Sequence, residues 1–399
     1  MQFRKDKKSG NDLSVLGFGC MRFPRGFGGG IDMQKTEWLI MEAINGGVNY
    51  FDTAYIYGGS EEALGTILEK NKARERVYIA TKLPLVMLKG PADFDKCFNK
   101  ELERLRTDYI DYYLMHMLTD RDMWETLKSW GIEEWIADKK KSGRIKQVGF
   151  SFHGSQEEFL RLLEVYPWEF CQIQYNYTGE TYQAGTAGLE KAAAMDLPVI
   201  IMEPLLGGKL AAPPPKAAAI FKQADPDRSP ADWALRWVWD HPEATVLLSG
   251  MNDPRQLEEN LAIAGKAQSG KLTGTEKDVY NQVLEVLNAS YKIRCTGCNY
   301  CMPCPRNVNI PGCFAAYNTS FSLGWMAGMQ QYATSATLTS TQSGSAANCI
   351  KCGKCEGHCP QHLPIRQALD QVRSRMEPPI IHGGIAIARA FLGRKNKKA

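Results

Sequence analysis

Short runs of apolar and β-branched residues alternate with amphipathic segments through the first two thirds of the chain. Between the runs, apolar residues recur at helical spacing, as at 36–45, 94–106, 124–141 and 156–165. Strands and helices that alternate in this way form a parallel sheet covered by helices. Eight repeats of this kind predict an α/β fold of the closed (β/α)8 TIM barrel type rather than an open sheet. The eight runs that we read as strands are residues 15–20, 48–52, 77–82, 110–116, 145–151, 170–176, 198–204 and 245–250.

The composition narrows the classes of function. The 399 residues include 48 basic and 44 acidic ones, and the net charge of +4 is spread evenly, which argues against a nucleic-acid-binding protein. No apolar run approaches the roughly 20 residues that span a bilayer, and the N-terminal stretch lacks the apolar core of a secretory signal. We therefore expect a cytoplasmic protein that is not transmembrane, in which clustered cysteines bind metal rather than form disulfides.

Eight of the 12 cysteines form two compact motifs, and each motif ends in Cys-Pro. The second motif matches the C-x2-C-x2-C-x3-C-P run of bacterial ferredoxins, whereas the first has one residue fewer before its last cysteine. The spacing predicts two 4Fe-4S clusters, with the last cysteine of each motif bound to the other motif's cluster. Zinc knuckles built from the C-x2-C pairs are the alternative. The predicted ligands are Cys295, Cys298, Cys301 and Cys304 of the first motif and Cys349, Cys352, Cys355 and Cys359 of the second.

The change from alternating strands and helices to cysteine motifs predicts the domain organisation. We expect a barrel domain at residues 1–290 and a small ferredoxin-like iron-sulfur domain at residues 291–378. The remaining residues, 379–399, form a basic C-terminal tail. The segment between the cysteine motifs is too long for a tight turn, so we expect a helix followed by a loop there.

Polar residues stand at the ends of three successive predicted strands. Asp52 ends the second strand and Tyr57 follows it, while Lys82 ends the third and His116 the fourth. Parallel strands bring their carboxyl ends to one mouth of a barrel, where barrel enzymes carry their catalytic groups. A nearby lysine favours the phenolate form of a tyrosine and makes it a better acid. Asp52 would hold Lys82 charged, and His116 would orient a carbonyl group and donate a hydrogen bond to its oxygen.

The stretch "DTAYIYGGSEEALG", residues 52–65, resembles the DTAxxYGxSExxLG signature of the aldo-keto reductase family. The resemblance covers roughly residues 1–290 and includes all four members of the family's catalytic tetrad, Asp52, Tyr57, Lys82 and His116. With the cysteine motifs, the chain resembles the subgroup that carries a C-terminal 4Fe-4S ferredoxin-like domain. The resemblance implies an NADP-dependent oxidoreductase that reversibly reduces an aldehyde or ketone to an alcohol, with Tyr57 as proton donor.

The resemblance also implies that NADP lies extended across the barrel mouth. Two positions depart from the family pattern, because Phe152 replaces an asparagine and Gly250–Met251 replaces a Lys-Ser pair. NAD therefore stays possible as the cofactor. The residues that match cofactor contacts are Ser151 and Gln172 for the carboxamide, Gln256, Glu259 and Asn260 for the adenine, and Asn252 for the 2′-phosphate.

Two functions stay open at this point. The first is carbonyl reduction at a substrate mouth lined by Tyr55, Phe23 and Trp124. The second is an iron-sulfur electron-transfer module whose barrel serves for docking rather than turnover. A barrel of this type moves two electrons together as hydride, whereas a cubane cluster moves one, and the sequence shows no flavin motif to convert between them. Either a flavin or a redox protein partner intervenes, or the clusters have a structural role, or they serve a separate step.

Overall fold

The computed structural model describes residues 1–26, 28–289, 292–293, 295, 297, 301–333, 344–359 and 363–377. The chain divides into two compact units. The first comprises Met1–Ala211 and Asp225–Lys277, and the second comprises Ala212–Ala224 and the described part of Asp278–Ala399. The domain boundaries at residues 290 and 378 stay predictions, and the basic tail at 379–399 lies outside the described residues.

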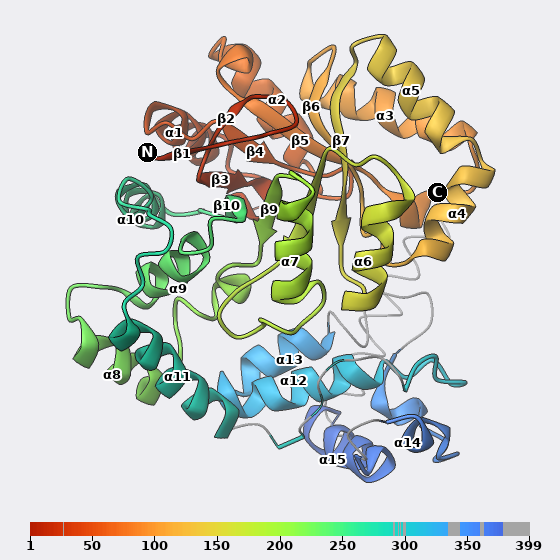
Figure 1. Cartoon of the computed structure of the whole chain (residues 1–399), viewed down its shortest axis with the longest axis vertical. Coiled ribbons are helices and arrows are strands. Elements are labelled where there is room, and N and C mark those ends of the chain that lie inside the picture. The colour runs from red at the N-terminus through yellow and green to blue at the C-terminus, as the bar shows by residue number, and fades with distance from the viewer. Residues whose placement is uncertain are drawn as a thin grey trace. The chain divides into compact units, whose positions relative to one another are not determined.

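The first unit contains a closed barrel of eight parallel strands, which confirms the predicted (β/α)8 fold (Figure 1). Every predicted run contains one strand, and the strands pair in chain order, with the last strand closing on the first. A short antiparallel hairpin, β1 (Phe3–Lys5) with β2 (Asp12–Ser14), precedes them and was not predicted. The barrel strands are β3 (Leu16–Gly19), β4 (Tyr50–Asp52), β5 (Tyr78–Leu83), β6 (Ile110–Met115), β7 (Ile145–Phe152), β8 (Phe170–Gln174), β9 (Val199–Met202) and β10 (Ala244–Ser249).

Helices follow the strands and surround the barrel in Figure 1. The segment 124–141, which was read as one helix, is broken, because Gly131 adopts a left-handed conformation with φ of +81°. Aspartate and serine side chains cap several N-termini, as at Asp120, Ser155 and Ser229. The helices of this unit are α1 (Met33–Asn45), α2 (Ser60–Lys70), α3 (Ala92–Leu105), α4 (Arg121–Ser129), α5 (Ile132–Lys141), α6 (Gln156–Val165), α7 (Gly185–Ala194), α9 (Pro230–Trp239) and α10 (Pro254–Ala264).

Apolar and aromatic side chains fill the barrel interior, with Tyr112 in contact with Tyr50 and Phe170 at ring-centroid distances of 5.2 and 5.1 Å. The glycine that closes the DTAxxYGxSExxLG stretch has a packing role. A Cβ atom on Gly65 would lie 2.4 Å from the carbonyl oxygen of Arg104, so α2 and α3 pack closely only because this position has no side chain. This packing fixes the position of α2 and of the segment before it, which carries Tyr55 and Tyr57.

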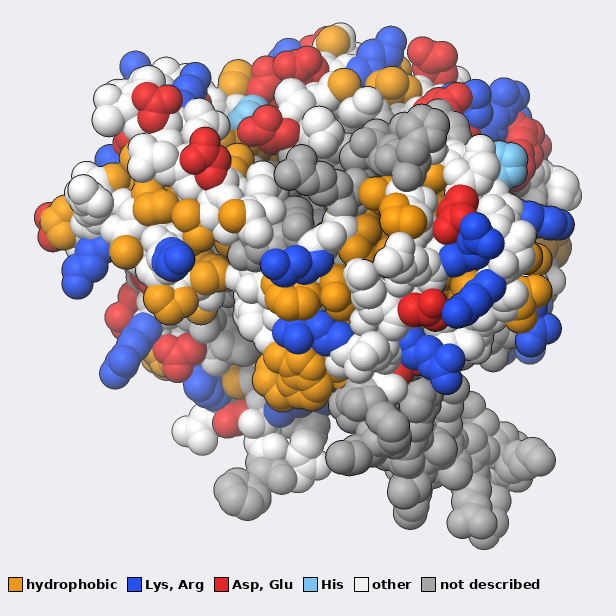
Figure 2. Space-filling model, turned by 90° about the horizontal axis from the view of Figure 1, so that it is seen from below, with side chains coloured by type: hydrophobic (Ala, Val, Ile, Leu, Met, Phe, Trp, Pro, Cys, Tyr) orange, Lys and Arg blue, Asp and Glu red, His pale blue; other side chains and the backbone are white. Residues whose placement is uncertain are grey.

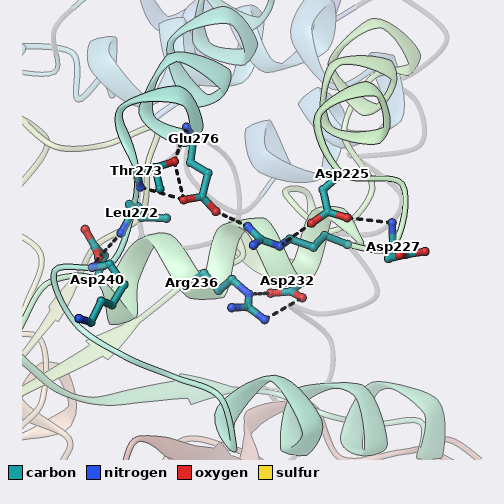
Figure 3. A network of polar contacts seen from close by, with 10 residues as sticks. Asp225, Asp227, Asp232, Arg236, Asp240, Leu272, Thr273 and Glu276 are labelled. Atoms are coloured by element: carbon teal, nitrogen blue, oxygen red, sulfur yellow. Dashed lines mark hydrogen bonds and ion pairs between the residues drawn. The ribbon is translucent and has the colours of Figure 1, made fainter.

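A polar network joins the segments around α9 within the first unit (Figure 3). The guanidinium of Arg228 contacts the carboxylates of Asp225, at 2.9 Å, and Glu276. Glu276 also accepts hydrogen bonds from the backbone N–H and the hydroxyl of Thr273, at 2.8 and 2.9 Å. Asp240 accepts one from the N–H of Leu272, at 2.9 Å. These contacts satisfy the backbone donors of Leu272 and Thr273, just before α11 (Gly274–Ala289) begins.

The described part of the second unit is helical around its own apolar core. Phe314, Leu369 and Val372 belong to this core, and seven cysteine side chains of the two motifs and their surroundings lie in it or beside it. Buried Glu377 accepts hydrogen bonds from the hydroxyls of Tyr332 and Ser345. The loop expected after 333 lies outside the described residues. The helices are α8 (Pro215–Ala224), α12 (Ile310–Ser322), α13 (Trp325–Tyr332), α14 (Lys354–Gly357) and α15 (Ile365–Met376).

The surface has no single dominant character on the face shown in Figure 2, where basic, acidic and hydrophobic side chains lie intermixed. This mixture agrees with the nearly balanced charge of the sequence. In the part of the chain that the structure describes, no helix combines the length and the apolar character that crossing a membrane requires.

Candidate functional site

The four predicted catalytic residues gather at the carboxyl ends of three neighbouring strands. Asp52 ends β4, Lys82 lies near the end of β5, and His116 directly follows β6. Tyr57 lies in the turn between β4 and α2, where its N–H donates to the carbonyl of Ala54 at 2.9 Å. Because the register pairs β4 with β5 and β5 with β6, these side chains belong to one corner of the barrel mouth.

Lys82 and Asp52 form a buried ion pair. The Lys82 ammonium lies 2.7 Å from Oδ1 of Asp52 and also donates to the carbonyl of Thr53 at 2.6 Å, and its side chain is only 1% exposed. Burial alone would lower the pKa of Lys82, but the charge and hydrogen bond of Asp52 together with the neighbouring Tyr57 outweigh burial, and the pKa lies above its usual value. Oδ2 of Asp52 accepts a hydrogen bond from Nε2 of Gln172 at 2.8 Å. The site therefore holds a charged lysine in a place where water has little access.

Tyr57 lies beside this pair. Its ring centroid is 5.2 Å from the Lys82 ammonium and 6.2 Å from the His116 ring, which it meets edge-on. Burial raises the pKa of Tyr57, and the positive charge of Lys82 offsets this only in part. The sequence analysis expected the lysine to dominate, whereas in the structure desolvation does. The phenol is thus held in its protonated, proton-donating form.

His116 is a neutral imidazole in the folded protein. It is buried, and burial together with the charge of Lys82 lowers its pKa to about 3. A second histidine, His153, follows β7 and has its pKa lowered to about 4, mainly by burial. The sequence analysis missed His153. Strand alternation gives a signal for it, because it lies two positions after Ser151 and so faces the same side of β7.

The residues matched to a nicotinamide contact lie at the ends of adjacent strands. Ser151 in β7 pairs with Gln172 in β8 in the barrel register, and both are buried. The Ser151 hydroxyl accepts a hydrogen bond from the N–H of Met117 at 2.9 Å, so it also anchors the loop after β6. The side-chain amide nitrogen of Gln172 donates a hydrogen bond to Asp52. The structure thus brings Gln172 into contact with the catalytic group.

The residues matched to adenine and phosphate contacts lie on α10 and just before it. Asn252 and Gln256 are exposed, and the N–H of Asn252 donates to Oε1 of Gln256 at 3.1 Å. Glu259 is exposed and accepts a hydrogen bond from the hydroxyl of Ser229. Asn260 is buried and donates to Ser249 at 3.0 Å, at the end of β10. Asn252 and Gln256 are therefore accessible to a ligand, whereas Asn260 faces the protein interior.

The predicted lining of the substrate mouth is wrong for Trp124. This side chain is fully buried, and its ring packs on Tyr166 and Trp168 at centroid distances of 5.2 and 4.8 Å. An amphipathic helix pattern cannot distinguish a side chain that faces the mouth from one that faces the neighbouring helix. The exposed apolar side chains on the loops after β4, β5 and β6 are instead Ile56, Val86, Met87 and Met117.

In the second unit, thiols from both motifs line one cavity of about 160 Å³. Burial raises the pKa of the Cys355 thiol, and the neighbouring charge of Glu356 and the nearby Cys349 and Cys304 add to this effect. Among the described side chains, no three His, Cys, Asp or Glu residues surround a point as ligands of a single ion do. The cysteines that line the cavity are Cys301, Cys304, Cys349, Cys352 and Cys355.

The first cysteine of each motif has the same local geometry. The N–H of Gly297 donates to the sulfur of Cys295 at 3.4 Å, and the N–H of Lys351 donates to the sulfur of Cys349 at 3.4 Å. Hydrogen bonds of this kind to thiolate ligands stabilise iron-sulfur clusters. Cys359 packs against the core of the second unit, and Cys298 lies outside the described residues.

The thiols outside the motifs are buried, as expected for core residues. Cys20, Cys97, Cys171 and Cys313 are all at most 7% exposed. Burial raises the pKa of Cys97 to about 11 and of Cys313 to about 12, so these thiols stay protonated at neutral pH. They are poor nucleophiles and poor metal ligands as a result.

Comparison with protein families gives two matches on this chain. A model described as "Aldo/keto reductase family" matches residues 15–269, and one described as "4Fe-4S dicluster domain" matches residues 294–363. The chain is 25% identical over 318 residues to "Aldo-keto reductase str7" of Strobilurus tenacellus, which covers 70% of this chain and 91% of the relative. It is 26% identical over 292 residues to "Probable aldo-keto reductase 1" of Glycine max, covering 63% and 81%.

Solved structures share the barrel. The aldo-keto reductase AKR11C1 from Bacillus halodurans in its holo form has a TM-score of 0.57 and 23% identity, and covers 71% of this chain and 96% of its own. An aldo-keto reductase from Klebsiella pneumoniae in complex with NADPH has a TM-score of 0.58 and 21% identity, with coverage of 71% and 95%. At this level of identity the likeness concerns the fold.

Proposed function

Because the chain belongs to the aldo/keto reductase family and carries a 4Fe-4S dicluster domain, we propose that it reversibly reduces an aldehyde or ketone with NADPH, Tyr57 being the proton donor. The observation that carries this proposal is the buried Lys82–Asp52 pair beside a protonated phenol and a neutral imidazole. Each of these groups is in the protonation state that general acid catalysis of carbonyl reduction needs.

The proton moves from the Tyr57 hydroxyl to the carbonyl oxygen. The phenolate that results lies close to the Lys82 ammonium, whose charge Asp52 maintains, so the negative charge on the ring is stabilised. His116, being neutral, donates a hydrogen bond from a ring nitrogen to the same carbonyl oxygen and orients the substrate. In the direction of alcohol oxidation, the phenolate takes the proton back.

The chain's residues fit a dinucleotide at this mouth. Bound NADPH supplies the hydride. We propose that Ser151 and Gln172 hold its carboxamide, since they lie on adjacent strands next to Asp52. Asn252 and Gln256 present accessible amides for the adenosine end. Glu259 and Asn260 lie on α10 with Gln256, and Asn260 takes part through its buried contact with Ser249. The preference for NADP over NAD rests on Asn252 in this proposal.

The substrate enters beside the exposed apolar side chains on the loops after β4, β5 and β6. Ile56, Val86, Met87 and Met117 are 36–68% exposed, which is unusual for side chains of this size near a catalytic corner. We propose that they contact the apolar part of a carbonyl compound. The small substrate, rather than a macromolecule, would then bury them.

The cysteine cavity supports the proposal of iron-sulfur clusters in the second unit. Cys304 of the first motif lines the same cavity as Cys349, Cys352 and Cys355 of the second, as exchange of the last cysteine between motifs requires. We propose that these four thiolates hold one 4Fe-4S cluster. Cys295, Cys298, Cys301 and Cys359 hold the other. A cytoplasmic setting, where thiols stay reduced, fits both clusters.

The test of the catalytic proposal is Tyr57→Phe in the full chain. We expect carbonyl reduction to fall by about 10²- to 10⁴-fold, because the proton donor is lost, while NADPH binding measured by fluorescence titration stays the same. Tyr109→Phe is the matched control, since Tyr109 lies just before β6, away from the carboxyl ends of the strands, and packs under Arg74. Full activity in Tyr57→Phe would contradict the proposal, as would an equal loss in both variants.

A further inference from the structure

The side chain of Arg366 lies at the cysteine cavity of the second unit. It lines this cavity together with Cys304, Cys349, Cys352 and Cys355. Its Cζ is 3.6 Å from the point where a Cβ atom on Gly353 would lie. Gly353 stands between Cys352 and Cys355, so the guanidinium packs directly on the backbone turn of the cysteine motif.

Glu356 fixes the position of this guanidinium. Its Oε2 accepts a hydrogen bond from Nε of Arg366 at 2.8 Å and lies 2.7 Å from the terminal nitrogen. Its Oε1 accepts one from the backbone N–H of Arg366 at 2.8 Å. A two-point contact to the side chain and a third to the backbone hold Arg366 in one orientation at the start of α15. Glu356 itself does not line the cavity, whereas the basic side chains of Arg366 and Lys354 do.

We propose that Arg366, positioned by Glu356, stabilises the reduced form of the cluster held by Cys304, Cys349, Cys352 and Cys355 and thereby raises its reduction potential. This rests on the proposed function, which places a 4Fe-4S cluster there. Reduction adds one electron from a one-electron donor to the cluster and moves no proton, so the cluster becomes more negative by one charge. A cation fixed at the cavity attracts the reduced form more strongly than the oxidised one.

Arg366 acts in this proposal through its charge rather than by ligation. Lys354 lines the cavity as well, from α14. Two other cations near the motif, Lys351 and Arg373, are not among the lining residues. Lys351 is drawn away to Asp370, at 2.9 Å. Arg373 is exposed on α15, two turns after Arg366, and does not line the cavity. Arg373→Gln therefore removes the same charge from the same helix and is the matched control.

The experiment is an anaerobic redox titration of the full, iron-loaded chain. The reduction of each cluster is monitored by electron paramagnetic resonance and visible absorbance. In Arg366→Gln we expect one cluster to be about three- to tenfold less reduced at a fixed potential, where tenfold corresponds to about 59 mV for a one-electron couple. The other cluster and the Arg373→Gln variant should keep the wild-type midpoints. The shift should shrink at high ionic strength, since Arg366 is exposed.

The outcomes separate this inference from the function on which it rests. Wild-type protein that binds no iron at this motif overturns the assignment of the cluster. Full iron content in Arg366→Gln with unchanged midpoints overturns the inference alone, and so does an equal shift in Arg373→Gln. If Arg366→Gln does not load iron, Arg366→Met gives the decision, because a loaded cluster without a lowered midpoint in that variant contradicts a role of the charge.

Discussion

At the scale of single residues, the barrel mouth sets protonation states by burial more than by charge. Burial raises the pKa of Tyr57 and lowers the pKa of His116 to about 3 and of His153 to about 4. Lys82 is the exception, because Asp52 at 2.7 Å and the neighbouring Tyr57 raise its pKa against the effect of burial. The sequence predicts which residue types meet here. It does not predict that desolvation dominates, since burial depends on how loops from several strands close over them.

The two neutral histidines make folding pH-dependent. In the unfolded chain each imidazole takes up a proton below about pH 6.5, but in the folded chain His116 does so only near pH 3 and His153 near pH 4. The unfolded state then binds more protons, so stability is present above pH 6.5 and is lost as the pH falls, by up to about 1.4 kcal/mol per pH unit for each residue.

We expect His116→Asn to flatten this dependence. The thermal unfolding midpoint of the barrel should fall less between pH 6.5 and 4.5 in the variant than in the wild type, because one proton-binding group is removed. His153→Asn should flatten it separately. Equal slopes in all three proteins would show that neither histidine is held neutral. Carbonyl reduction by His116→Asn at neutral pH gives an independent measure of its role in orientation.

At the scale of elements, short continuous apolar runs predict all eight barrel strands, because each strand is buried on both faces in a parallel barrel. The short β1–β2 hairpin has only three residues in each strand and leaves no periodic pattern. The break between α4 and α5 depends on the left-handed Gly131, and a glycine in a helical pattern does not by itself mark a helix end. The burial of Trp124 under Tyr166 and Trp168 depends on helix packing.

The spacing of the two cysteine motifs predicts which cysteines share a cluster, and iron analysis can test this prediction. Cys304→Ala should reduce the iron content from about eight to about four per chain, since one cubane cluster is lost. If Cys304 shares a cluster with the second motif, adding Cys349→Ala should remove no more iron. Adding Cys295→Ala instead should remove both clusters.

The opposite pattern, with Cys295→Ala costing nothing further and Cys349→Ala removing both clusters, would mean that each motif closes on itself. Cys313→Ala is the control, because this thiol is buried in the same unit but is not a proposed ligand. It should keep its full iron content. Cys304 lines one cavity with Cys349, Cys352 and Cys355, as the exchanged arrangement requires, and Cys301 of the first motif lines it too.

At the scale of the whole molecule, the chain combines two kinds of redox chemistry. The barrel moves a hydride, which carries two electrons, whereas each cluster takes one electron at a time. Cys352 is exposed, and Ile350 beside it is 59% exposed, so the second motif is open to solvent on one side. A redox protein could exchange electrons there without passing them through the barrel. The difference between two-electron and one-electron chemistry leads us to predict two activities that run independently unless a partner links them.

We therefore expect NADPH to support carbonyl reduction without bleaching the clusters. The measurement is an anaerobic titration of the iron-loaded chain with NADPH, with and without an aldehyde, in which cluster absorbance and product are followed together. Dithionite, a one-electron donor, should bleach the same sample and shows that the clusters are competent. Tyr57→Phe separates the alternatives further, because it removes carbonyl turnover and leaves the cysteine motifs intact. Bleaching of the clusters by NADPH at the rate of carbonyl turnover would show that the barrel and the clusters exchange electrons directly. Bleaching of the wild type without an aldehyde, and with no carbonyl turnover when one is added, would favour an electron-transfer module in which the barrel only docks a partner.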